Sequence, residues 1–264
     1  MIKAINCNNS NFTKKLTILL EKRRQVKRYD TKIVSSIIND IKKNKIKALL
    51  KYEKKFSKNK NIKPSKIQIN TAIKKLDPKV KKAIDFAYDR ILKFHSIQLK
   101  NLKNIIYKDK YKNKLEYRNV PIESVGIYVP GNLPSTLMMI SIPAKLAKVK
   151  RLVLATPKIN GNLNPAVLYV AKKVGIKEIY SFGGAQAIAS LAYIQKVNKI
   201  LGPGNRFVAE AKRQLSGKVI GTESMFAGPS EICVLADKDS NIDQVATSLI
   251  SQAEHDSDSQ CILI

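Results

Sequence analysis

Hydrophobic positions change their spacing about midway along the chain. Before residue 120 they recur at steps of three and four, with Lys at most other positions, which is typical of amphipathic helices. Residues 33–52 and 80–99 carry this pattern most clearly. Asp77 followed by Pro78 offers a helix start, because Asp caps helices and Pro suits their first turn. The sequence predicts a helical region up to about residue 120, with a loop at residues 58–61.

After Pro121, short β-branched runs alternate with helical segments. This alternation predicts βαβ units, and therefore an α/β fold with parallel sheets and right-handed crossovers. The expected strands are residues 125–129, 151–155, 178–182, 199–201, 218–221, 231–236 and 260–264. The expected helices are residues 134–148, 165–174, 185–194, 207–215 and 242–255.

Composition favours a folded protein of the reducing cytoplasm. The 264 residues are 44% apolar and 26% charged, enough to bury a sizeable core. No apolar run approaches the roughly 20 residues of a membrane span, and the first residues lack the apolar stretch of a secretory signal. The three Cys are scattered, so they form neither a disulfide framework nor a zinc pair at short spacing.

The net charge of +29 raises the question of nucleic-acid binding. Residues 1–120 carry 34 Lys and Arg against 9 Asp and Glu, a net of +25, whereas residues 121–264 carry only +4. A basic arm of this kind attracts phosphates. However, Lys outnumbers Arg 41 to 8, and base and phosphate recognition favours Arg. A Lys-rich composition that decorates solvated helix faces is therefore the favoured interpretation, and no specific nucleic-acid partner is expected.

Three glycine turns follow predicted strands: residues 129–132, 183–186 and 202–205. Ligands of α/β sheets bind at the carboxyl ends of strands, where helix N-termini also attract anions. None of the three turns has the spacing of a dinucleotide fingerprint, and glycine is also what tight turns require. Both interpretations stay open from spacing alone. Gln186 and Asn205 are the polar side chains best placed to contact a ligand.

Two further groups carry candidate chemistry. Gln252 and His255 lie three residues apart on a predicted helix, so both leave the same face and could bind a metal. One His makes a weak metal signal, and a solvated helix C-terminus explains the pair equally well. Ser230 follows Gly-Pro and lacks the frame of a nucleophile elbow, so a turn role is the simpler interpretation.

Read in order, these segments resemble the histidinol dehydrogenase family. The resemblance covers essentially all 264 residues and includes the N-terminal Phe94-His95 and Gln98. The blocks that carry it are Gly126-Ile-Tyr128-Val-Pro130-Gly131, Pro134-Ser-Thr136-Leu-Met138, Ile142-Pro-Ala-Lys145, Gly183-Gly-Ala-Gln186-Ala-Ile188-Ala189, Gly202-Pro-Gly-Asn205, Ala211-Lys-Arg213, Ala227-Gly-Pro-Ser230-Glu231 and Ser251-Gln-Ala-Glu-His255.

The resemblance implies zinc-dependent oxidation of L-histidinol to L-histidine with two NAD, in the last steps of histidine biosynthesis. It implies that Tyr128, Gln186 and Asn205 contact NAD. It also implies that Gln252 and His255 bind zinc and border the substrate, which Ser230 contacts. Zinc would mainly position the substrate.

The family's architecture implies two Rossmann-like domains, one inserted in the other, and a homodimer. The inserted domain would be residues 128–230; residues 1–127 and 231–264 would be the N-terminal helical segment and an incomplete first domain. The family's catalytic Glu-His pair and two further zinc ligands are expected beyond Ile264, so no catalytic residue is assigned and the chain alone is expected to turn over poorly. The loops at residues 131–134 and 193–196 are shorter than in the family.

An alternative of a different class also fits the charge. The chain could be a non-catalytic remnant, or a basic nucleic-acid-binding protein on the same fold. The glycine turns and the Gln252–His255 pair favour the enzyme lineage, because a binder that relies on charge alone needs neither.

Overall fold

The computed structural model describes residues 4–21, 28–100, 102–223, 231–254 and 259–264. Its contacts divide the chain into two units, residues 29–226 and residues 1–28 with 227–264. The helices of residues 29–100 belong to the unit that contains the four-stranded sheet. The predicted boundaries, residues 128–230 against 1–127 with 231–264, stay a prediction.

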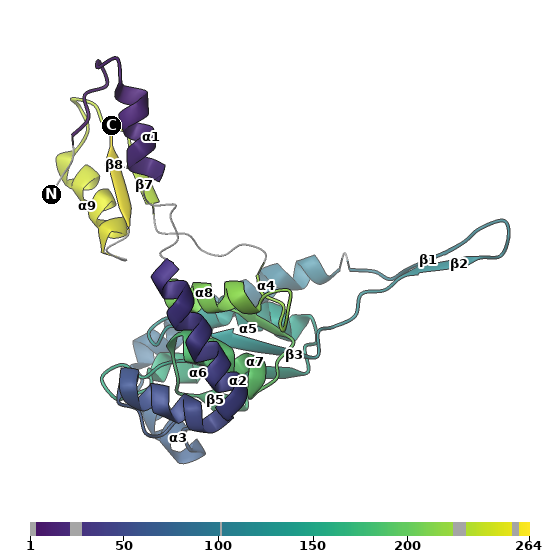
Figure 1. The fold of residues 1–264 in the computed structure, drawn as a ribbon. Helices are drawn as coiled ribbons and strands as arrows, with labels where there is room; N and C mark the ends of the chain where they lie inside the picture. The colour runs from purple at the N-terminus through teal and green to yellow at the C-terminus, as the bar shows by residue number, and fades with distance from the viewer. Residues whose placement is uncertain (1–3, 22–27, 101, 224–230, 255–258) are drawn as a thin grey trace. The chain divides into compact units, whose positions relative to one another are not determined.

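The larger unit is a three-layer α/β structure around a parallel sheet (Figure 1), which confirms the predicted fold class. The strand order is β5-β4-β3-β6, and all neighbours are parallel. The strands are β3 (Ser124–Tyr128), β4 (Arg151–Ala155), β5 (Glu178–Tyr180) and β6 (Lys199–Leu201). The helices are α2 (Arg28–Ser57), α3 (Lys66–Lys74), α4 (Pro78–Leu99), α5 (Pro134–Leu146), α6 (Pro165–Val174), α7 (Gly184–Tyr193) and α8 (Arg206–Leu215).

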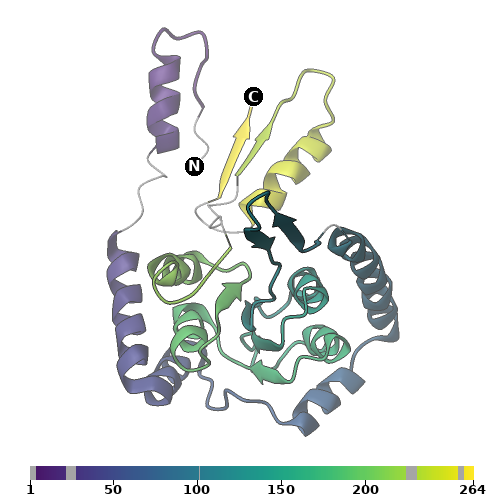
Figure 2. The same cartoon turned by 90° about the vertical axis from the view of Figure 1, so that its right-hand side faces the viewer.

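Alternation along the strands sends side chains to two separate cores. Val125 and Ile127 face the core that α3, α4, α5 and α6 cover. Tyr128, Val153 and Ile200 face the core that α2, α7 and α8 cover. Figure 2 shows these two groups of helices on opposite sides of the sheet. Because both faces are covered, the strands read as nearly continuous apolar runs.

Local signals explain several helix ends. Asp77 caps α4 by accepting a hydrogen bond from the Lys79 amide at 2.7 Å, and Pro78 opens the helix, as the sequence predicts. Ser65 caps α3 in a reciprocal capping box with Gln68. Gly175 ends α6 with a φ of 92°, a conformation that favours glycine.

Residues 105–117 contradict the predicted helical region. They form a two-stranded antiparallel hairpin of β1 (Ile105–Lys108) and β2 (Lys114–Tyr117), which Figure 1 shows extending from the rest of the unit. The turn is held by the Asp109 carboxylate, which accepts hydrogen bonds from Tyr111 and Asn113. The β-branched and aromatic residues Ile105, Ile106, Tyr107 and Tyr117 favour strands over a helix.

A second predicted element is also wrong. Residues 218–221 form no strand; they follow the turn at Gly217, whose φ is 72°, and make only isolated bridges such as Lys199 to Gly221. The segment after α8 therefore folds back onto the end of that helix, and Ile220 is buried against the core. The other strands and helices predicted after Pro121 are confirmed to within about two residues of their ends, and the helix predicted at residues 33–52 is longer, Arg28–Ser57.

The smaller unit contains one βαβ arrangement. The strands β7 (Glu231–Val234) and β8 (Gln260–Leu263) are parallel neighbours, and α9 (Ile242–Ala253) connects them. The unit also contains α1 (Phe12–Glu21). Within the described parts of both units, no helix has the length and apolarity that a membrane crossing requires.

Candidate functional site

The carboxyl end of the four-stranded sheet gathers the three glycine turns. They follow β3, β5 and β6, so parallel pairing brings them to one edge, as the sequence predicts. The chain runs from β3 outward to β5 and then returns to place β6 on the other side of β3. The carboxyl ends of β3 and β6 therefore meet at a topological switch point, the place where α/β sheets bind ligands.

Close backbone approach explains the glycines. Gly202 has a φ of 127°, and a Cβ there would lie 1.8 Å from the Tyr128 carbonyl oxygen. At Gly131 a Cβ would lie 2.7 Å from the Pro157 carbonyl oxygen. The turns after β3 and β6 are thus pressed against neighbouring strand ends, and larger residues would move them.

Tyr128 lies at the end of β3 and points into the core. Its side chain is 5% exposed, and its hydroxyl accepts a hydrogen bond from the Gly184 amide at 3.3 Å. Burial raises the pKa of Tyr128, so the hydroxyl stays protonated. The residue therefore connects β3 to the turn that opens α7.

Glu53, which the sequence analysis did not single out, completes this connection from α2. It is 1% exposed, and its Oε1 accepts hydrogen bonds from the Gly183 amide at 3.1 Å and from Gln186 Nε2 at 2.8 Å. Its Oε2 is buried and has no hydrogen-bond partner among the described residues. Burial raises the pKa of Glu53. The available signal was an acid placed four residues after Leu49 on the apolar stripe of a Lys-rich helix.

Gln186 and Asn205 lie in different surroundings. Gln186 is 3% exposed, with its side-chain amide donating to Glu53. Asn205 is exposed and caps α8, since its Oδ1 accepts from the Phe207 and Val208 amides at 3.2 Å each. A structural role therefore accounts for Gln186 and for one atom of Asn205.

Lys212 of α8 stabilises the turn after β6. Its side chain is 2% exposed, and its ammonium group donates to the Gly202 carbonyl and to the Glu223 carboxylate. The sequence placed Lys212 inside the block 211–213 without giving it a role. A buried Lys needs such partners, because an unpaired buried charge is costly.

The helix N-termini at this edge differ in how their amides are used. Asn164 caps α6, Asn205 caps α8, and Glu53 of α2 reaches the start of α7. The N-cap of α5 is Leu133, which makes no side-chain hydrogen bond, and Pro134 follows it. Since α5 follows β3 at the switch point, the backbone amides of its first turn are positioned to stabilise an anionic ligand there.

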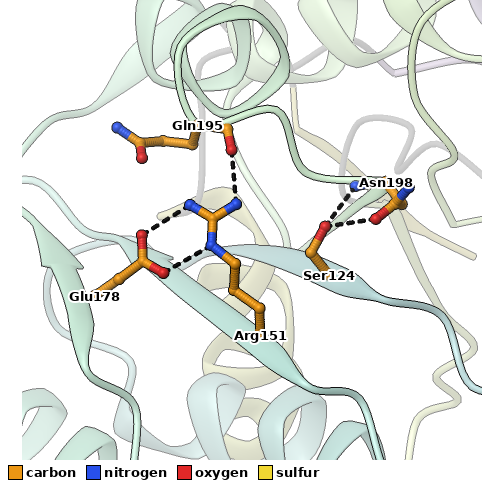
Figure 3. Close-up of polar contacts among 5 residues, drawn as sticks. All are labelled: Ser124, Arg151, Glu178, Gln195 and Asn198. Carbon is orange, nitrogen blue, oxygen red and sulfur yellow. Dashed lines mark hydrogen bonds and ion pairs between the residues drawn. The ribbon is translucent and has the colours of Figure 1, made fainter.

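The opposite end of the sheet is held by complete polar pairs (Figure 3). Arg151 donates to both oxygens of Glu178 at 2.7 and 2.8 Å and to the Gln195 carbonyl at 2.7 Å. The Ser124 hydroxyl donates to Asn198 Oδ1 at 2.5 Å and accepts from the Asn198 amide at 3.1 Å. These contacts join the amino ends of the four strands.

The predicted metal and substrate residues belong to the smaller unit or lie outside the described residues. Gln252 lies in the last turn of α9 and is half-buried. His255 and Ser230 fall outside the described residues. Among the residues that are described, no three His, Cys, Asp or Glu side chains gather into a metal-binding group.

Comparison with known proteins gives one consistent result. The sequence profile of the family described as "Histidinol dehydrogenase" matches residues 20–264. The chain is 57% identical to histidinol dehydrogenase from Pelagibacter ubique over 271 residues, covering all of this chain and 63% of the relative. It is 46% identical to the enzyme from Campylobacter jejuni strain RM1221, covering 89% of this chain and 56% of the relative.

A solved structure agrees with the sequence comparisons. The crystal structure of histidinol dehydrogenase from Elizabethkingia anophelis matches with a TM-score of 0.75 and 42% identity, covering 88% of this chain and 55% of that one. The chain therefore spans between half and two thirds of the length of these relatives. With a family match over most of its length and a shared α/β core, the chain belongs to the histidinol dehydrogenase family.

Proposed function

We propose that this chain is the N-terminal part of an enzyme that oxidises L-histidinol to L-histidine in the last steps of histidine biosynthesis. The alcohol passes through an aldehyde to the acid, and each of two NAD molecules accepts one hydride while water supplies the second oxygen. The observation that carries the proposal is the 57% identity to a histidinol dehydrogenase across the whole chain.

NAD would bind at the carboxyl end of the four-stranded sheet. The donor chemistry there suits it: Asn205 is exposed beside the switch point, and its Oδ1 caps α8, so Nδ2 is the atom that would donate to the cofactor. The first turn of α5, without a side-chain cap, would suit the pyrophosphate. Tyr128 and Gln186 are buried, so they would shape the Gly183–Gly184 turn beneath the cofactor.

Zinc would involve Gln252 and His255, with Ser230 against the substrate. Gln252 is half-buried at the end of α9 and offers an amide oxygen, a ligand that completes sites built from His and carboxylate. Two ligands leave zinc weakly held, so further ligands and the catalytic Glu-His pair must come from residues other than these. When bound, zinc would orient the substrate.

We further propose a homodimer in the cytoplasm.

A chimera tests the proposal directly. We would fuse this chain to the remaining part of the Pelagibacter ubique enzyme and supply zinc, NAD and L-histidinol. We expect the chimera to form two NADH per histidinol, and the present chain alone to turn over at least about 100-fold more slowly, since it lacks an acid–base pair. A chimera that folds and binds zinc but forms no NADH would contradict the proposal.

The charge of residues 1–120 motivates one competing function, nucleic-acid binding. Binding that depends only on charge falls steeply with salt. We expect any binding of this chain to a mixed-sequence duplex to disappear by physiological salt. Binding that persists there, with a preference for one sequence, would favour the competing function.

A further inference from the structure

Glu53 is a buried acid that the proposed reaction does not use. It reaches from α2 across 130 residues of sequence to the Gly183 amide, and its neighbour in space, Gln186, is one of the proposed cofactor residues. Both contacts use Oε1, whereas Oε2 is buried without a partner among the residues that the structure describes. A structural acid normally pairs with a base, so this arrangement needs another explanation.

Burial of Glu53 shifts its equilibrium toward the neutral form. Burial raises its pKa, while hydrogen bonds from Gln186 and Gly183, with smaller contributions from Asn59 and Ser57, act in the opposite direction. All four are neutral groups. From β3, the Tyr128 hydroxyl faces Glu53, and burial keeps that hydroxyl protonated. In the loop after β4, the Lys158 ammonium donates to Asn59 Oδ1 at 2.9 Å. Asn59 therefore lies between Lys158 and Glu53.

The same carboxyl group lies at the start of α7. A charge there would matter, because the positive end of a helix is where an anionic cofactor group gains stabilisation. An ionised Glu53 would use up part of the stabilisation that the positive end of α7 offers an anion, and it would repel a nearby phosphate. Its charged Oε2 would also draw the Gln186 amide and the Gly183–Gly184 turn inward. A neutral Glu53 holds the turn without opposing the cofactor.

We propose that Glu53 is a positioning residue for the cofactor: in its protonated form it fixes Gln186 and the Gly183–Gly184 turn, and its ionisation weakens cofactor binding. This inference rests on the proposed function, because it assumes that NAD binds at this edge of the sheet. It assigns Glu53 no contact with the cofactor, since the side chain is 1% exposed.

The test is NADH affinity as a function of pH. We would titrate NADH into the 264-residue chain from pH 5 to pH 9 and follow NADH fluorescence, to which a chain without Trp adds little background. In the wild type we expect affinity to fall as pH rises through the pKa of Glu53, by up to about tenfold per pH unit. E53Q mimics the protonated acid, so its affinity should stay near the acidic wild-type value at every pH.

Two further variants separate positioning from general stability. E178Q removes a carboxylate at the other end of the sheet and should keep the wild-type pH dependence. E53A removes both hydrogen bonds and should weaken binding about equally at every pH. A wild-type pH dependence in E53Q, with NADH still bound, would overturn this inference alone. If the folded wild type binds no NADH at any pH, the proposed cofactor site fails first, and this inference with it.

Discussion

At the amino end of the four-stranded sheet, the Arg151 guanidinium satisfies both oxygens of Glu178 and a backbone carbonyl. At the carboxyl end, Glu53 Oε1 accepts two hydrogen bonds, whereas Glu53 Oε2 accepts none from the described residues. The exposures are also opposite: the Glu178 side chain is 34% exposed and Glu53 is 1% exposed. One end pairs its charges near water, and the other buries an acid without a base.

This contrast separates contacts that hold the fold from contacts that prepare a site. The amino-end pairs join four strand ends, and both Glu178 oxygens accept a hydrogen bond from Arg151, so folding alone explains these pairs (Figure 3). The carboxyl end keeps a buried acid, a buried Lys and tightly packed glycines in one place. Such costs persist where a site requires them.

The largest expected effect comes from the glycine turns. In G202A the new Cβ would lie 1.8 Å from the Tyr128 carbonyl oxygen, at a φ of 127°. We expect a loss of at least about 3 kcal/mol in the free energy of unfolding, because backbone must move to relieve the clash. Urea unfolding followed by circular dichroism measures it.

Gly221 is the matched position beside the start of β6. Its Cβ would meet Lys199 Cγ at 3.4 Å, an ordinary contact. G221A should therefore cost less than about 1 kcal/mol. If G202A and G221A lost the same stability, tight glycine packing would not distinguish the carboxyl end of the sheet from its amino end.

The second effect is the response of the two acids to pH. Glu53 has a raised pKa, so between its ordinary value of 4.5 and the raised one the unfolded chain loses a proton that the folded chain keeps. The wild type thus loses stability as pH rises through that window. E53Q lacks this loss, and its stability relative to the wild type should rise with pH, by about 1–3 kcal/mol in total.

Glu178 should respond in the opposite direction. The hydrogen bond from Arg151 lowers the pKa of Glu178, so its contribution is present above 4.5 and disappears as pH falls through the lowered value. We expect E178Q to cost about 0.5–1 kcal/mol at neutral pH, the range for a partly exposed pair, and almost nothing in acid. Urea unfolding at several pH values measures both variants, and slopes of the same sign would contradict the comparison.

Local signals predicted much of the fold and part of this site. The glycine turns and the Asp77-Pro78 start are each encoded within a few residues, and the structure places them as expected. Glu53 was missed because its partners lie 130 and 133 residues away, beyond any periodic pattern. The hairpin at Ile105–Tyr117 was missed because its short apolar runs also fit a helical spacing.

Asn205 allows capping and cofactor binding to be measured separately. N205D keeps an oxygen for the Phe207 and Val208 amides and should leave the stability of the chain within about 0.5 kcal/mol. It adds a negative charge beside the proposed cofactor, which we expect to weaken NADH binding about fivefold, or roughly 1 kcal/mol.

Asn164 provides the control, since it caps α6 through the Ala166 and Val167 amides in the same way. N164D should keep NADH affinity within about twofold of the wild type, as measured by the same fluorescence titration. Equal weakening in both variants would mean that added charge anywhere at this edge is enough, and the assignment of Asn205 would fail.

The smallest effect should come from R151K at the amino end. Lys keeps the charge but gives up the paired hydrogen bonds to Glu178, and it reaches the Gln195 carbonyl less well. Because both side chains are about a third exposed, at 36% and 34%, we expect a loss of only about 0.5–1 kcal/mol, smaller still in high salt. NADH affinity should not change, since the pair lies at the opposite end of the sheet from the proposed cofactor. A loss of NADH affinity at unchanged stability would mean that the amino end also shapes the site, and that satisfied polar pairs do not mark purely structural contacts in this fold.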